Sequence, residues 1–134
     1  MISMNELIVG TKWDLIPSDH QDNLNILLDR LNLVRVVFGR AMTITSGYRS
    51  MKHHLEIYAK KGMIDKSKIP LKSLHLFGQA ADVYDPKKIL QAWCLANVKE
   101  LEEIELWMED FSYTTTWCHF QILPPKSLKR FFIQ

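Results

Sequence analysis

Three polar side chains interrupt apolar stretches of this sequence. His75 lies shortly before Gly78, Asp82 follows two alanines and precedes a valine, and His119 lies between a cysteine and a phenylalanine. A buried carboxylate is costly unless a cation or a dense set of hydrogen-bond donors surrounds it. Two imidazoles and a carboxylate can hold a metal ion and leave a fourth position for water, the pattern of catalytic zinc sites. The same residues can instead form a structural Asp–His pair, and their spacing leaves both interpretations open.

The alternation of side chains along the predicted strand 117–122 places His119 and Cys118 on opposite faces. Successive side chains of a strand point to opposite faces, so Trp117, His119 and Gln121 are expected on one face and Cys118 on the other. Cys118 is therefore predicted to be a small core residue rather than a ligand. With two cysteines in all, the chain has too few thiols for a disulfide framework or a four-thiolate zinc site.

The remaining histidines are weaker candidates for a metal site. His20 falls in the first turn of a predicted helix, where a solvated surface role is expected. His53 and His54 are neighbours on another predicted helix and point about 100° apart, so they cannot easily share one metal ion. The sequence also lacks the HExxH motif of the commonest zinc-protease helix.

The elements that position His75, Asp82 and His119 can also be predicted. Helices and strands follow one another without a regular βαβ repeat. A helix beginning at Ser18, with Gln21 as its capping-box partner, has apolar residues at helical spacing and ends before Gly39. Asp85 is expected to cap a later helix whose first residue is Pro86. Helices are predicted over residues 18–38, 51–61 and 86–101, and strands over residues 41–45, 79–83, 104–108 and 117–122. Residues 63–74 are predicted to form a loop that can include a helical turn.

Length, composition and charge narrow the class of protein. A chain of 134 residues fits one domain, and the mixture of elements predicts an α+β domain over residues 1–134, with helices packed on a small, mostly antiparallel sheet. The net charge of +2 argues against nucleic acid as a partner, because phosphate binding usually leaves a strongly basic surface. No apolar run is long enough to insert stably in a membrane, and the first residues lack the basic region of a secretion signal. We expect a monomer that is made in the cytoplasm.

Three segments, in this order, resemble the M15 family of zinc peptidases: SGYRS (Ser46–Ser50), SLHLFGQAADV (Ser73–Val83) and WCHFQ (Trp117–Gln121). That family includes D-Ala-D-Ala carboxypeptidases, D-Ala-D-Ala dipeptidases and phage peptidoglycan endopeptidases. The similarity covers about residues 41–122, most of the chain. It implies the fold of the D-Ala-D-Ala carboxypeptidases.

The resemblance also implies roles for individual residues. His75, Asp82 and His119 would bind one zinc ion. Arg49 would face the substrate and bind a carboxylate or the scissile carbonyl oxygen, and a planar, always-charged fork beside zinc suits an anion or a developing oxyanion. Ser73, two residues before the first ligand, would contact the substrate.

One position departs from the family pattern. Many members carry an acidic residue three positions before the last zinc ligand, as general base, and here that position is Thr116, which cannot take up a proton. Gln121 stands at a second position that is often acidic in relatives. Asp110 and Glu109, which precede the loop between the last two predicted strands, are the replacement candidates, with Asp110 slightly preferred.

The expected function is therefore zinc-dependent hydrolysis of peptide bonds in the stem peptides of bacterial peptidoglycan. The resemblance is greatest to members from tailed phages, which implies an endolysin or a virion-associated hydrolase made in the host cytoplasm that acts at the bacterial cell wall. Because of Thr116, an inactive zinc-stabilised module with a structural or wall-binding role is the alternative. A metal-free domain with a purely structural His75–Asp82 pair is a third, weaker one.

Overall fold

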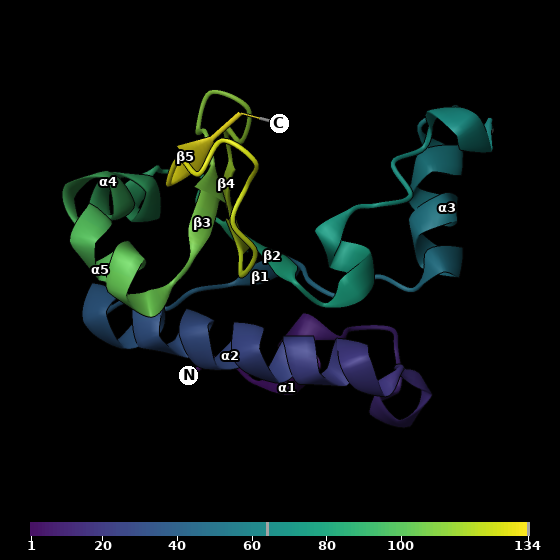
Figure 1. The fold of residues 1–134 in the computed structure, drawn as a ribbon, viewed down its shortest axis with the longest axis horizontal. Coiled ribbons are helices and arrows are strands. Elements are labelled where there is room, and N and C mark those ends of the chain that lie inside the picture. Colours follow the sequence, from purple (N-terminus) through teal and green to yellow (C-terminus); the bar gives the residue numbers. More distant parts are fainter. Residues whose placement is uncertain (64, 134) are drawn as a thin grey trace.

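The computed structural model describes residues 1–63 and 65–133 and has an α+β architecture, as the sequence predicts. The long helix α2 runs along one side of the sheet, α4 and α5 pack at one end, and α3 stands apart at the other end (Figure 1). The helices of the described residues are α1 (Met4–Leu7), α2 (Ser18–Phe38), α3 (Met51–Lys60), α4 (Ile89–Ala96) and α5 (Val98–Ile104). Short 3₁₀ helices cover Trp13–Leu15, Lys66–Lys68 and Leu74–Phe77.

The strands of the described residues form one five-stranded sheet in the order β1-β2-β4-β3-β5. The pairs β1–β2, β2–β4 and β3–β4 are antiparallel, and β3–β5 is parallel, so the sheet is mostly antiparallel as predicted. Asp82 on β2 lies opposite Ser46 on one side and His119 on the other. The strands are β1 (Ile44–Ser46), β2 (Ala80–Tyr84), β3 (Trp107–Glu109), β4 (Trp117–Gln121) and β5 (Phe131–Phe132).

The two faces of the sheet have different roles. Cys118 and Phe120 are fully buried on the face that joins the hydrophobic core, together with the apolar stripe of α2, while His119 and Gln121 point to the opposite face and line a cleft. The predicted alternation along β4 is therefore confirmed. Burial raises the pKa of the Cys118 thiol, as expected for a core residue rather than a ligand.

The start of α2 differs from its prediction, whereas its body does not. The apolar spacing buries Leu24 and Leu31, and the helix ends at Gly39 in the left-handed conformation. The predicted capping box at Ser18 is wrong, because the Gln21 side chain donates instead to the Trp13 carbonyl at 2.9 Å. The preceding 3₁₀ turn brings that carbonyl within reach of the glutamine.

The helix predicted over residues 86–101 is divided in two and begins later. Asp85 does cap a helix, but its carboxylate accepts hydrogen bonds from the backbone N–H groups of Leu90 and Gln91, at 3.0 and 2.8 Å, across an intervening turn. Pro86 lies in that turn rather than in the helix. At Asn97 the backbone leaves helical geometry, and its side chain donates to the Trp93 carbonyl at 2.8 Å, which separates α4 from α5.

Other boundaries shift by a few residues. The strands predicted over residues 41–45 and 104–108 occupy Ile44–Ser46 and Trp107–Glu109, while those predicted over 79–83 and 117–122 are correct to within one residue. The predicted 63–74 loop contains 3₁₀ turns, and its residue 64 lies outside the described residues. None of the helices in the described part of the chain is both long enough and apolar enough to span a bilayer.

Gly78 illustrates how tightly the turn before β2 is constrained. Its φ is +72°, and a Cβ atom there would lie 2.8 Å from Leu24 Cγ and 2.9 Å from the His20 carbonyl oxygen. Gly39 has a similar φ of +77° but open space around it. The turn therefore needs glycine for two independent reasons, conformation and room.

We expect Gly78→Ala to lower the free energy of unfolding by about 2–4 kcal/mol, because it adds a steric overlap in the core to the left-handed strain. The matched control Gly39→Ala carries the strain alone and should cost about 1 kcal/mol. Urea unfolding followed by tryptophan fluorescence measures both. Equal losses for the two variants would show that the close packing at Gly78 has no energetic importance.

Candidate metal centre

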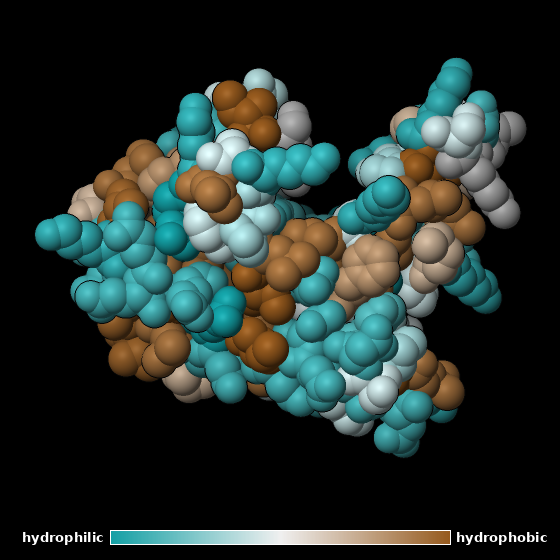
Figure 2. Space-filling model, viewed as in Figure 1, coloured by the Kyte–Doolittle hydropathy of each residue, from teal (hydrophilic) through white to brown (hydrophobic). Residues whose placement is uncertain are grey.

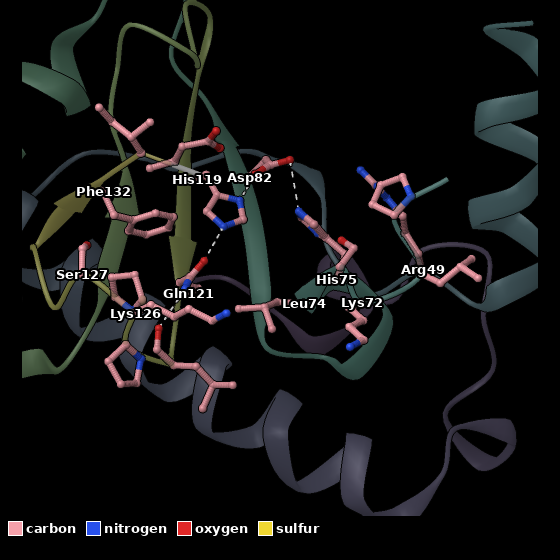
Figure 3. A pocket seen from close by; sticks show the side chains of 18 of the residues that line it. Arg49, Lys72, Leu74, His75, Asp82, His119, Gln121, Lys126, Ser127 and Phe132 are labelled. Atoms are coloured by element: carbon pink, nitrogen blue, oxygen red, sulfur yellow. Dashed lines mark hydrogen bonds and ion pairs between the residues drawn. The ribbon is translucent and has the colours of Figure 1, made fainter. Parts of the chain in front are cut away.

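Three side chains from separate segments meet on the open face of the sheet. His75 comes from the 3₁₀ helix Leu74–Phe77, Asp82 from β2 and His119 from β4, and one ligand atom of each lies within 4.8 Å of the others. Asp82 is central: its Oδ2 is 3.5 Å from His75 Nε2 and its Oδ1 is 3.0 Å from His119 Nδ1 (Figure 3). The group could hold a metal ion.

A backbone carbonyl fixes the orientation of the first imidazole. His75 Nδ1 lies 2.9 Å from the Gly47 carbonyl oxygen, and since a carbonyl can only accept, Nδ1 carries a proton and Nε2 is the nitrogen that faces Asp82. The Arg49 N–H in turn donates to the His75 carbonyl at 3.1 Å. Gly47 approaches α1 so closely that a Cβ atom would overlap the Leu7 carbonyl oxygen. The Gly47–Arg49 segment therefore braces His75.

A buried amide fixes the second imidazole. The Gln121 Nε2 group donates to the Leu123 carbonyl at 2.8 Å, so its Oε1 faces His119 Nε2 at 3.0 Å and accepts that proton. His119 Nδ1 is then left to face Asp82. The sequence predicts that Gln121 shares a strand face with His119 and shows that it replaces an acid often found in relatives, but it does not predict an orienting role. Its place two residues from a ligand on the same strand face was the signal for this role.

The electrostatics of the group suit a cation. Burial raises the pKa of Asp82, but hydrogen bonds from His119 and His75 lower it more, so the net pKa lies well below the ordinary value. Burial lowers the pKa of His119, and the bond to Asp82 outweighs this and raises it. His119 Nδ1 is thus a position where either a proton or a metal ion can sit beside the carboxylate. Two imidazole nitrogens and a carboxylate oxygen are donors that zinc accepts, so the residues fit the predicted ion.

The group lies in a cleft of about 1050 Å³, open in the space-filling view between α3 and the C-terminal part of the sheet (Figure 2). One wall comes from the chain around α3, including Arg49 and Ser73. The other comes from β4 and the segment after it, including Trp117 and Lys126. The cleft thus gives a ligand of peptide size access to the candidate metal centre.

Arg49 lines the cleft beside the candidate metal centre. Its Nε and Nη2 donate to Ser46 Oγ at 3.2 and 2.9 Å, and Ser46 is the β1 residue paired with Asp82. Two of its five N–H donors are used in this contact, and the others remain for a ligand in the cleft. Ser73 lines the same wall.

The two candidate acids, Glu109 and Asp110, lie in different surroundings. Glu109 lines the cleft and Asp110 does not. The Asp110 Oδ1 atom accepts hydrogen bonds from the Ser112 N–H and hydroxyl in an exposed turn, which lowers its pKa. The β3–β4 register pairs Trp107 with Gln121, and extending it places Glu109 across from His119. Burial raises the pKa of Glu109, with repulsion from Asp82 adding to the effect and attraction to His119 opposing it.

The remaining candidates lie outside the metal group. Thr116 is exposed, and its carbonyl accepts from the Asp85 N–H at 2.8 Å. His20 was expected to be solvated, but its side chain is only 18% exposed and its Nδ1 lies 3.2 Å from Tyr48 Oη. His53 is exposed and His54 is buried, so these neighbours do point into different surroundings.

Comparison with protein-family models, curated protein sequences and solved structures gives no match for this chain. The similarity to zinc peptidases therefore stays a prediction from the three motifs. The geometry adds a buried His–Asp–His group that could hold a metal ion, with an arginine and a glutamate on the surrounding cleft.

We expect zinc to stabilise the folded chain, by about 2.7 kcal/mol at a free zinc concentration near 100 times Kd. Asp82→Asn should abolish most of this gain, because it removes the carboxylate that both imidazoles face, whereas Asp110→Asn should keep it. Thermal unfolding with added zinc and after chelation measures the effect. An unchanged midpoint for the wild-type chain would contradict a zinc site.

Gln121→Met is expected to weaken zinc affinity by about 10- to 100-fold, since methionine keeps the volume but removes the acceptor that fixes His119. Ser127→Ala alters another residue of the same cleft and should leave the affinity unchanged. Competition with a chromophoric chelator gives both dissociation constants. Equal affinities for the Gln121→Met and wild-type proteins would mean that His119 needs no such support.

Proposed function

We propose that this chain is a zinc-dependent peptidase that hydrolyses peptide bonds in bacterial peptidoglycan, with one zinc ion held by His75, Asp82 and His119. The main support is the number of ligands and their place: three protein donors at an accessible cleft rather than four in a closed site. Structural zinc sites are usually closed by four protein ligands, whereas catalytic sites keep one position for water or substrate. The order of motifs and the α+β sheet support the M15-type fold as part of this proposal.

Zinc bound at this centre would acidify a water molecule and polarise the peptide carbonyl. Glu109 is the residue that handles the proton: its carboxylate takes one proton from the attacking water and returns it to the leaving amine. Its place on the cleft, across the register from His119, supports this role, and burial raises its pKa, the direction that favours a general base. Asp110, which accepts two hydrogen bonds from Ser112, is not required as a general base in this mechanism.

Arg49 stabilises the negative charge that develops on the scissile carbonyl oxygen. Its guanidinium is held by Ser46 on the strand next to Asp82, so its remaining donors lie in the cleft near the metal group. Donors fixed in advance cost no reorganisation when charge develops. Ser73 lines the same wall and is assigned to substrate binding.

The biological setting proposed is lysis or entry by a tailed phage, as an endolysin or a virion-associated hydrolase. This rests on the resemblance of the three motifs. The inactive wall-binding module is the alternative outcome of the test below, and Glu109 in the cleft favours the enzyme over it.

Purified peptidoglycan should release soluble peptides when treated with the zinc-loaded chain, stop doing so with a chelator, and resume on zinc addition. Glu109→Gln should lower the rate by about 10²- to 10⁴-fold while zinc stays bound, because the general acid–base is lost. The matched variant Asp110→Asn should keep a rate close to that of the wild-type chain. Mass spectrometry of the released peptides gives the rates.

Two results would overturn the mechanism in different ways. A protein that carries one zinc ion per chain but releases no peptide is the inactive module. If Glu109→Gln leaves peptide release unchanged and Asp110→Asn abolishes it, Asp110 is the general base.

A further inference from the structure

We propose that the cleft selects acidic peptides, with ligand carboxylates held by Lys72 on one wall and Lys126 on the other. This rests on the proposed function in taking the cleft as a peptide site, and it adds the chemical class of the peptide. Both lysines line the cleft, yet they come from segments more than fifty residues apart in the sequence. Figure 3 shows the two side chains on either side of Leu74.

The charges of the cleft are segregated. Its anionic groups are Asp82 and Glu109, which belong to the metal group and its immediate surroundings. Its cationic groups are Arg49, Lys72 and Lys126. Within residues 1–63 and 65–133, none of these three cations has a carboxylate at ion-pairing distance. Although the chain has almost as many acids as bases, these three cations of the cleft therefore face no ion-paired carboxylate among the described residues.

Proline-containing turns position both lysines. Lys126 follows Pro124 and Pro125, and the turn is closed by the Leu128 N–H, which donates to the Pro125 carbonyl at 3.0 Å. Lys72 follows Pro70, whose carbonyl lies 2.7 Å from Nε2 of the buried His54. Their backbones are therefore fixed before a ligand arrives, which lowers the cost of binding.

The pattern of charge favours discrete carboxylates over a continuous polyanion. Lys72 and Lys126 lie on opposite sides of Leu74, whereas Asp82 belongs to the metal group and Glu109 lies across the strand register from His119. A nucleic-acid strand would bring closely spaced phosphates past those two carboxylates. A peptide can instead present separate acidic groups to the lysines and an uncharged backbone to the metal group. The apolar surfaces of Trp117 and Leu74 in the cleft also suit a peptide.

The test compares a soluble peptidoglycan stem peptide that has free side-chain carboxylates with the same peptide amidated at those groups. Binding is measured by fluorescence anisotropy on zinc-loaded protein carrying Glu109→Gln, so that turnover does not interfere. The free-acid peptide should bind more tightly, and its Kd should rise with salt because exposed charges are screened. The Kd of the amidated peptide should change little with salt.

Variants of single lysines show which residues cause the preference for the free-acid peptide. Lys72→Gln and Lys126→Gln should each weaken binding of the free-acid peptide by about two- to fivefold and leave the amidated peptide unaffected. Lys129→Gln is the matched control, because Lys129 lies in the same loop as Lys126 but does not line the cleft, and it should change neither Kd. Equal Kd values for the two peptides, or equal losses in the control and the cleft variants, would overturn the inference.

The outcome is separable from that of the peptidase assay. If peptidoglycan is cut but amidation of the peptide has no effect on binding, the inference fails and the proposed function stands. If the acid peptide is preferred through Lys72 and Lys126 but nothing is cut, the cleft is an acidic-peptide site without the peptidase activity.

Discussion

The Asp82 carboxylate is the constraint to which the rest of the site responds. Its side chain is only 14% exposed, inside a strand whose neighbouring residues are buried and apolar. A charge so placed requires nearby groups of opposite character, and two imidazoles provide them. The β2–β4 register brings one imidazole, and the turn at Gly78 brings the other. The backbone carbonyl of Gly47 and the buried amide of Gln121 then hold both rings.

The three members of the candidate metal group could be singled out in the sequence because they conflict with their surroundings, but only the resemblance to zinc peptidases predicted that they bind a metal ion. His75, Asp82 and His119 are polar residues in apolar runs, and such a conflict is visible without coordinates. The faces of β4 followed from strand alternation in the same way. The different surroundings of Glu109 and Asp110 could not be predicted without the β3–β4 register, which brings only alternate residues to the face that carries the metal group. Both acids are plausible until that register is known.

The features that could not be predicted depend on backbone atoms from distant or irregular segments. Gln121 orients His119 only because a carbonyl two residues further on fixes the amide. Gly47 supports His75 across 28 residues of sequence, through a carbonyl that carries no side-chain signal. The division between α4 and α5 arises where the Asn97 side chain bonds to the Trp93 carbonyl rather than continuing the helix. The secondary-structure propensities of the residues cannot predict any of these contacts.

The segment that holds α3 leaves and rejoins the domain at neighbouring points, because the Arg49 N–H is bonded to the His75 carbonyl. Within the segment, the buried His54 lies 2.7 Å through its Nε2 from the Pro70 carbonyl oxygen, a contact internal to the segment. A loop whose ends are fixed together tolerates changes of length at a small entropic cost. Residues between Arg49 and His75 form one wall of the cleft and can therefore be replaced, by evolution or by grafting. Such a replacement would alter which ligands the cleft accepts, while the three residues of the candidate metal group keep their geometry.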